Sequence, residues 1–373
     1  MGARSGAGWS DRPADPLPAM APAVDAEPRY VDVELAGVGG MGTVMIAHDR
    51  HLGRDVAIKR IAAEPDDLAA GARLAREAAI TARLEHPSVV PIYDAGVGPD
   101  GRPYYAMRLV RGRSLAERLA DAPDLGARLT LVRAFLAVCQ AMAYAHRQGV
   151  IHRDLKPANV MIGEFGEVHV VDWGLARRLD EPEPDHEALA GTPAYLAPER
   201  ARGEGSTPAS DVWSLGAILG EILCGAALLP ASRLEILARL SASQPPPWPW
   251  PPRCPGELVA IAHKALAWQV ADRYPDAEVL AADVSAYLDG RRVGAHAYST
   301  TELARRLVYA WRWQVAAVTA GVVAGSVVLA LTWSRIAGEQ RRAIVAERRA
   351  TAALADTRVA LAWALDQIGR AHV

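Results

Sequence analysis

The stretch from Val150 to Ile162, "VIHRDLKPANVMI", constrains the fold of this chain more strongly than any other. It places a carboxylate, an ammonium group and a carboxamide within six positions, at Asp154, Lys156 and Asn159. Apolar residues stand on both sides of these polar groups, so the pattern predicts two short strands joined by a polar loop. A chance match to so many distinct positions is not expected. The loop therefore indicates a site that the rest of the fold has to build.

A glycine-rich stretch, "AGVGGMGTV", lies near the beginning of the chain. Glycines at this spacing are weak evidence by themselves and also occur in dinucleotide-binding turns. Such a turn is followed directly by a helix, whereas the next residues here, "TVMIAHD", are apolar and β-branched and predict a strand. We therefore expect a hairpin that folds over nucleotide phosphates, because glycine lets backbone amides approach phosphate oxygens. The expected nucleotide contacts in it are Gly37, Val38, Gly39, Gly40, Gly42 and Val44.

Two charged residues downstream of the hairpin are expected to form a pair. The stretch "DVAIKRI" places Lys59 at the end of an apolar run that predicts a strand. Lys59 and Ala57, two positions earlier, are further expected nucleotide contacts. An ammonium group there would hold the α- and β-phosphates of a nucleotide, and it needs a fixed carboxylate partner. Glu77, in the helical stretch "LAREAAITARLEHP", is the candidate. Taken alone Glu77 would be a solvated helix residue, but Lys59 upstream favours the pair.

The remaining polar motifs suit phosphoryl transfer. The stretch "VVDWGLA" supplies Asp172, which would bind magnesium together with Asn159, because charge builds on the phosphates during transfer. Asp154 would accept the proton of the substrate hydroxyl group, and Lys156 would steady the γ-phosphate. Three further motifs follow in order: "GTPAYLAPE", "SDVWSLG" and "ADRYPDA".

Together and in this order, the motifs resemble those of bacterial serine/threonine protein kinases of the eukaryotic-like (Hanks) type. The resemblance covers residues 29–289 and implies an α+β, bilobal protein-kinase fold. A small β-rich lobe would comprise residues 29–107, and a large helical lobe would comprise residues 108–289. ATP and Mg²⁺ would bind between the lobes, and the substrates would be protein serine and threonine residues.

The resemblance also implies roles for individual residues. Met107 would be the gatekeeper, and Arg108 to Val110 would form the hinge whose backbone meets adenine. Asp211 would brace the catalytic loop, and Glu199 would pair with Arg273 in the large lobe. The sequence departs from the family pattern at Trp173, where Phe is usual, and at Arg108, where Glu is common. Neither change removes a charged catalytic group.

The segment between Asp172 and Gly191 contains no Ser, Thr or Tyr. In many relatives, a phosphate on this activation segment pairs with the catalytic-loop arginine, which is Arg153 here. We expect Thr192 to hydrogen-bond Asp154 instead of acting as a switch. Our hypothesis is that an acidic residue pairs with Arg153 or Arg177 and replaces the phosphate; the candidates are Asp180, Glu181, Glu183, Asp185 and Glu187. The alternative is that these acids only solvate a loose loop.

An uncharged stretch near the end of the chain predicts a single transmembrane helix over residues 313–334. Tryptophans stand at both ends of it, as in an aromatic belt, and arginines flank both sides, so charge does not set the orientation. The alternative is a buried core helix. Ala317, Gly321 and Gly325 recur every four residues and suggest a homodimer through this face, although small residues are common in this chain.

The other segments complete the expected organisation. Residues 1–28 are rich in Ala, Pro and Gly without an apolar run, which predicts a disordered leader and no signal peptide. Residues 290–312 are expected to be a juxtamembrane linker. Residues 335–373 predict an exposed helix or short coiled coil, and we expect the natural chain to continue beyond it.

The overall properties leave three classes of function. The net charge of −2 gives no indication of a nucleic-acid partner. The leading interpretation is a single-pass kinase in the bacterial inner (cytoplasmic) membrane, with its kinase domain in the cytoplasm, where ATP is. A pseudokinase that binds ATP and acts as a membrane scaffold is the alternative, and the presence of every charged catalytic residue disfavours it. A small-molecule kinase is disfavoured by the complete "GTPAYLAPE" motif.

Overall fold

The computed structural model describes residues 28–39, 42–61, 67–98, 100–182, 190–229 and 247–370, together with residues 232, 235, 236, 238 and 240. The expected leader up to residue 27 lies outside them, as does Gly40. The chain divides into two units, Met1–His296 and Ala297–Val373. The expected α+β, bilobal architecture is confirmed in the first unit.

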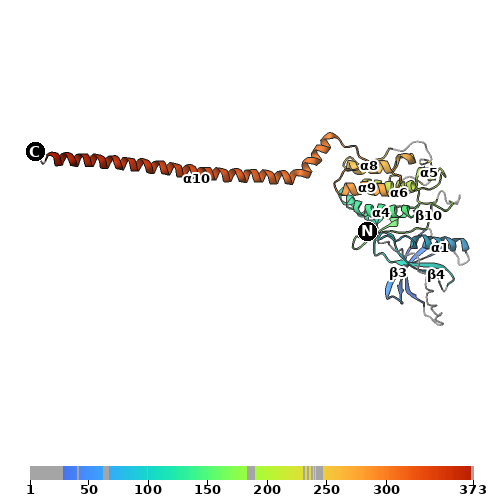
Figure 1. The fold of residues 1–373 in the computed structure, drawn as a ribbon. Helices are drawn as coiled ribbons and strands as arrows, with labels where there is room; N and C mark the ends of the chain where they lie inside the picture. The colour runs from blue at the N-terminus through green and yellow to red at the C-terminus, as the bar shows by residue number, and fades with distance from the viewer. Residues whose placement is uncertain are drawn as a thin grey trace, which may run out of the picture. The chain divides into compact units, whose positions relative to one another are not determined.

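The small lobe is one antiparallel sheet with one helix. The strands are β1 (Tyr30–Gly39), β2 (Gly42–Asp49), β3 (Arg54–Arg60), β4 (Ile92–Val97) and β5 (Pro103–Arg108), in the order β1-β2-β3-β5-β4. Helix α1 (Leu68–Ala82) begins where the Asp67 side chain accepts a hydrogen bond from the amide of Ala70. Its buried Leu74 and Ala78 pack with Tyr105 of β5, which anchors the helix to the sheet. Figure 1 shows α1 beside the strands of the small lobe.

The first two strands form the predicted glycine-rich hairpin. Gly39 pairs with Gly42 across its tip. Gly42 has a φ of +151°, and a Cβ atom there would lie 2.1 Å from the carbonyl oxygen of Arg60 on β3. Only glycine allows the hairpin to approach β3 this closely, so the second strand can lie flat against the third.

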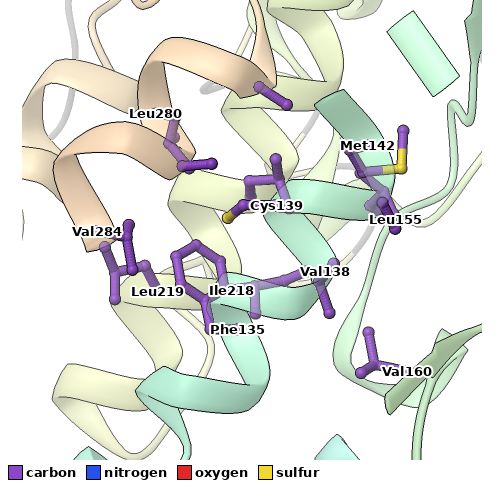
Figure 2. Close-up of a cluster of buried hydrophobic side chains, with 14 of the residues drawn as sticks. Phe135, Val138, Cys139, Met142, Leu155, Val160, Ile218, Leu219, Leu280 and Val284 are labelled. Atoms are coloured by element: carbon purple, nitrogen blue, oxygen red, sulfur yellow. The ribbon is translucent and has the colours of Figure 1, made fainter. Parts of the chain in front are cut away.

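The large lobe is built around a buried helix, α6 (Pro208–Cys224). Apolar side chains of α4 (Val132–Arg147), α6 and α9 (Ala277–Leu288) meet in one core (Figure 2). Phe135 and Cys139 come from α4, Ile218 from α6 and Leu280 from α9, and all four are fully buried. The other helices are α2 (Leu115–Asp121), α3 (Leu125–Leu129), α5 (Pro198–Ala201) and α8 (Gly256–Ala265).

Short strands carry the polar loop that the sequence singled out. Strand β7 (Val150–Ile151) precedes the loop and pairs with β10 (Arg177–Arg178). Strand β8 (Val160–Gly163) follows it and lies between β6 (Gly112–Ser114) and β9 (Val168–Val170). The two strands expected on either side of the loop are therefore β7 and β8. They hold its ends, so the polar residues between them are fixed from both sides.

The second unit contains one long helix, α10 (Thr300–Arg370). It begins inside the expected linker 290–312 and runs without a break through the expected span 313–334. Its part Trp311–Trp363 is long and apolar enough to cross a membrane, and none of its most apolar stretch is buried. The segment Leu125–Arg147 passes the same test, but it contributes to the core of the large lobe.

Candidate active site

Lys59 joins three elements of the fold. Its Nζ lies 2.6 Å from Oε1 of Glu77 on α1 and 2.7 Å from Oδ1 of Asp172, which follows β9. Burial acts to lower the pKa of Lys59, but the two carboxylates outweigh it and the pKa is raised. Lys59 is therefore a cation held between the lobes. The predicted pair between Lys59 and Glu77 is present in the structure.

Tyr105 on β5 supports this pair. Its hydroxyl group donates a 2.8 Å hydrogen bond to the same Oε1 of Glu77, in a buried setting. Burial and the neighbouring carboxylate raise the pKa of Tyr105 well above its ordinary value, so the phenol stays protonated and remains a donor. The sequence did not single out Tyr105, because nothing in its neighbourhood marks it as a partner of a helix residue.

Asp154 lies at the centre of a polar network. Its Oδ1 accepts hydrogen bonds from the amide and the hydroxyl group of Thr192, both at 2.8 Å. Its Oδ2 accepts from Nζ of Lys156 at 2.6 Å, and the same ammonium group donates to Oγ1 of Thr192 at 2.9 Å. Thr192 thus contacts Asp154 as expected. The network fixes the carboxylate on both of its oxygens.

Asn159 and Asp172 are the two residues that the sequence analysis assigned to Mg²⁺. Nδ2 of Asn159 donates to the carbonyl oxygen of Asp154 at 2.9 Å, so the amide oxygen points away from that carbonyl. Burial acts to raise the pKa of Asp172, but Lys59 outweighs it and the pKa is lowered, which keeps the carboxylate charged. Carboxamide and carboxylate oxygens suit Mg²⁺, which takes its other ligands from phosphates and water. Among the described residues there is no cluster of three or more His, Cys, Asp or Glu side chains that could hold a metal ion.

Asp211 at the start of α6 braces the loop, as the resemblance implied. It is buried, and its carboxylate accepts hydrogen bonds from the amides of His152 at 2.8 Å and Arg153 at 2.9 Å. A third partner is Nε2 of His146, at 3.0 Å. Arg153 has a φ of +72°, a strained conformation for a residue with a side chain. The contacts of Asp211 compensate part of this strain and keep the loop in one conformation.

A cavity of about 670 Å³ opens between the lobes, a size that suits a nucleotide. It is lined by nine of the expected nucleotide contacts: Gly37, Gly42, Val44, Ala57, Lys59, Met107, Arg108, Val110 and Asp172. Asp154, Lys156 and Thr192 line it too. Asn159 does not line the cavity and is almost fully buried beside Asp154. Val38 and Gly39 belong to β1 opposite Thr43 and Gly42, and Gly40 lies outside the described residues.

Several apolar lining residues were not expected from the sequence. They are Ala36, Val90, Ala158, Met161, Val171 and Leu175, while Leu109 belongs to the expected hinge. Two of them carried a usable signal: Val171 directly precedes Asp172, and Met161 stands two positions after Asn159 in β8. Val90 stands three positions after the stretch "LAREAAITARLEHP", outside the quoted motifs, and the packing of the lobes brings it to the cavity.

Two acidic residues of the activation segment bind other arginines than the ones considered in the sequence analysis. The carboxylate of Asp180 binds Arg178, with Oδ1 2.9 Å from Nε. The carboxylate of Glu181 binds Arg76 on α1, with Oε2 2.6 Å from Nη2. Arg177 donates to the backbone carbonyl of Glu181 instead of the carboxylate. Asp180 and Glu181 are therefore not the acidic side chains that bind Arg177, and the hypothesis stays a prediction for the remaining candidates. The other candidates, Glu183, Asp185 and Glu187, lie outside the described residues.

The sequence of this chain is similar to those of known proteins. The family model described as "Protein kinase domain" matches residues 30–284. The serine/threonine-protein kinase PknD of Protochlamydia amoebophila is 36% identical over 297 residues, which cover 70% of this chain and 30% of that protein. PknB of Mycolicibacterium smegmatis is 37% identical over 273 residues, which cover 70% of this chain and 43% of that protein. PknD of Chlamydia trachomatis serovar D is 35% identical over 301 residues, which cover 70% of this chain and 32% of that protein.

The match of the family model lies in the first structural unit of the chain. The chain spans less than half the length of these curated relatives. The match of the family model covers the glycine-rich hairpin, Lys59, Asp154 and Asp172, which line the cavity described above. The chain therefore belongs to the protein kinase domain family, and the relatives to which it is similar are bacterial serine/threonine protein kinases.

Proposed function

We propose that this chain is an ATP-dependent serine/threonine protein kinase that signals from a membrane. The observation that carries the proposal is Lys59, which bridges Glu77 and Asp172 at 2.6 and 2.7 Å beside the Asp154 network. A chain that only bound ATP would not need Asp154 held by Thr192 and Lys156. The similarity to serine/threonine kinases supports the same activity.

The residues of the cavity have separate roles in this proposal. Bound Mg-ATP would supply the phosphoryl group and the charge neutralisation that transfer needs. Lys59 would bind the α- and β-phosphates, while Asn159 and Asp172 would hold Mg²⁺. Asp154 would orient the substrate hydroxyl group and accept its proton, and Lys156 would steady the γ-phosphate.

The second unit would anchor the kinase in the bacterial cytoplasmic membrane. The proposal rests on α10, which is long, apolar and exposed over the expected span 313–334. Because ATP is cytoplasmic, the kinase domain would lie on the cytoplasmic side and the end of α10 on the other. We include a homodimer through Ala317, Gly321 and Gly325, since glycine and alanine every four residues let two helices approach closely.

The test compares the full chain with its Asp154→Asn variant, both in lipid nanodiscs with ATP and Mg²⁺. We expect the wild-type protein to transfer labelled phosphate to a generic basic protein on Ser and Thr. The variant should bind ATP with unchanged affinity and lose at least about a hundredfold in rate, because general-base catalysis contributes that much. Mass spectrometry would identify the phosphorylated residues.

Two outcomes would contradict the proposal. ATP binding without phosphate transfer in the wild-type protein would favour the scaffold alternative. Equal transfer by the wild type and the Asp154→Asn variant would show that the activity belongs to a contaminant or to another group.

A further inference from the structure

Arg200 connects the catalytic loop with the end of the activation segment. It lies in α5, directly after Glu199, and is 2% exposed. Its Nη1 donates a 2.6 Å hydrogen bond to the carbonyl oxygen of Arg153, and its Nη2 donates one of the same length to the carbonyl oxygen of Ala190. One rigid guanidinium group thus holds two backbone segments that are far apart in the sequence. Hydrogen bonds from a charged donor are among the stronger ones.

The first of these carbonyls belongs to the strained residue of the loop. Arg153 has a φ of +72°, and its amide is held by Asp211 at 2.9 Å. Its carbonyl group is part of the peptide unit that leads to Asp154, whose own amide donates to Nδ1 of His152 at 3.3 Å. Asp211 and Arg200 therefore fix the peptide groups before and after Arg153. Rotation of the second peptide group would move the backbone of Asp154.

The second carbonyl, that of Ala190, lies two residues before Thr192, which hydrogen-bonds the carboxylate of Asp154. Ala190 precedes Gly191, which has a φ of +119°, and a Cβ atom on it would lie 3.1 Å from the carbonyl oxygen of Arg153. Glycine at this position lets the two backbones approach closely enough for one arginine to reach both. Thr192 comes next and donates to Oδ1 of Asp154 through its amide and its hydroxyl group.

We propose that Arg200 is a positioning residue that sets the orientation of the Asp154 carboxylate by holding the backbone on both sides of it. The inference rests on the proposed function, in which Asp154 is the base. It also addresses how the end of an activation segment without Ser, Thr or Tyr is ordered: a built-in buried cation holds it, and no added phosphate is needed for this contact. Arg200 itself touches neither ATP nor the substrate in this role.

The experiment uses the full chain in nanodiscs with three variants: Arg200→Ala, Arg200→Gln and Arg200→Lys. We expect Arg200→Ala and Arg200→Gln to lower kcat by about 10- to 100-fold, because a small misplacement of a catalytic group costs that much. The KM for ATP should change by less than about threefold, because Arg200 does not line the nucleotide cavity. Arg200→Lys should retain intermediate activity, since one ammonium group can reach one of the two carbonyls.

Chemical rescue separates positioning from a general loss of structure. Millimolar ethylguanidinium should restore part of the kcat of Arg200→Ala and leave the wild-type rate unchanged, because it supplies the missing donor. The matched control is Arg202→Gln, two residues along, where the side chain pairs with Glu204 at the surface. We expect this control to keep the wild-type kcat and KM.

Each outcome decides between the alternatives. Wild-type kcat in Arg200→Ala or Arg200→Gln would overturn the proposal. A loss of kcat would indicate a structural role only in any of three cases. Ethylguanidinium fails to rescue Arg200→Ala, the KM for ATP rises as well, or Arg200→Lys is as inactive as Arg200→Ala. If Arg200→Ala does not fold, the kcat and KM of Arg200→Lys decide. If Asp154→Asn is as active as the wild type, the proposed function has failed, and not the role of Arg200.

Discussion

Single residues of this protein carry buried charge, and each described case has a specific compensation. The pair of Glu199 and Arg273 is the clearest example. Two nitrogens of the Arg273 guanidinium group lie 2.8 Å from the two oxygens of Glu199, and Ser210 donates to the same carboxylate. Burial acts to raise the pKa of Glu199, but the hydrogen bonds from Arg273 outweigh it and the pKa lies below its ordinary value of 4.5. The pair ties the "APE" motif to the "ADRYPDA" motif, so it holds α5 in place.

We predict that Glu199→Gln lowers the free energy of unfolding of the kinase domain by about 3 to 5 kcal/mol, because it leaves the buried Arg273 cation unpaired. The stabilisation by Glu199 should be complete above pH 4.5, because its folded-state pKa is depressed, and should be lost as the pH falls through that folded-state pKa. Urea unfolding followed by tryptophan fluorescence at several pH values measures both effects. The control Glu204→Gln, in a surface pair, should leave the curve unchanged; equal effects of the two variants would contradict the prediction.

At the scale of whole elements, an ion pair between described residues connects the activation segment with α1. Arg76 and Glu77 are adjacent on α1; Arg76 binds Glu181 of the segment, and Glu77 binds Lys59. The orientation of α1 that pairs Glu77 with Lys59 therefore also places Arg76 at the segment. The side chains of Arg76 and Glu181 are 36% and 40% exposed, so the pair is screened by solvent and contributes less than about 1 kcal/mol.

We predict that Arg76→Glu lowers kcat by at most about fivefold, and that the double variant Arg76→Glu with Glu181→Arg restores it, because the swap rebuilds an exposed pair of limited strength. The loss should shrink at high salt. Steady-state kinetics at two ionic strengths measure both effects. The exposed Arg73 on the same helix offers the control Arg73→Glu. A double variant no better than either single variant would show that the pair does not couple the two elements.

At the scale of the whole molecule, the two units differ in whether their apolar side chains are buried or exposed. The first unit buries its apolar residues in cores within its two lobes. The second exposes valine, leucine and tryptophan along α10 over more than one helical face. A helix that is apolar all round is stable where lipid or other helices cover it. The apolar composition of α10 over residues 313–334 is therefore better suited to a lipid environment than to water.

We predict that the wild-type chain stays in the membrane pellet after alkaline carbonate extraction. The double variant Val322→Arg with Val323→Arg should move to the soluble fraction, since each arginine near the bilayer centre costs about 2.5 to 3.5 kcal/mol. The control Val359→Arg lies beyond the expected span 313–334 and should stay in the pellet. Extraction of the wild-type chain by carbonate would contradict the proposed anchor.

Much of the kinase domain could be predicted because its candidate catalytic residues lie in short contiguous motifs. Asp154, Lys156 and Asn159 share one loop, and the apolar residues on either side of that loop suffice to predict its strands. The glycine-rich hairpin was predictable because the strand pattern after Gly42 excluded a helix. The pair of Lys59 and Glu77 was predictable from the residues that their motifs contain.

Other contacts depend on the tertiary structure, because they join positions that no local pattern connects. Tyr105 on β5 supports Glu77 of α1, and the carboxylate of Glu181 binds Arg76, whereas Arg177 binds the backbone carbonyl of Glu181. Arg200 reaches backbone carbonyls, which are present at every residue and leave no signal in the sequence. The sequence by itself thus determined which groups are the candidates for the chemistry, since side-chain types and their spacing are local. Only the tertiary structure decided which residues hold these groups in place, because that depends on how distant segments pack.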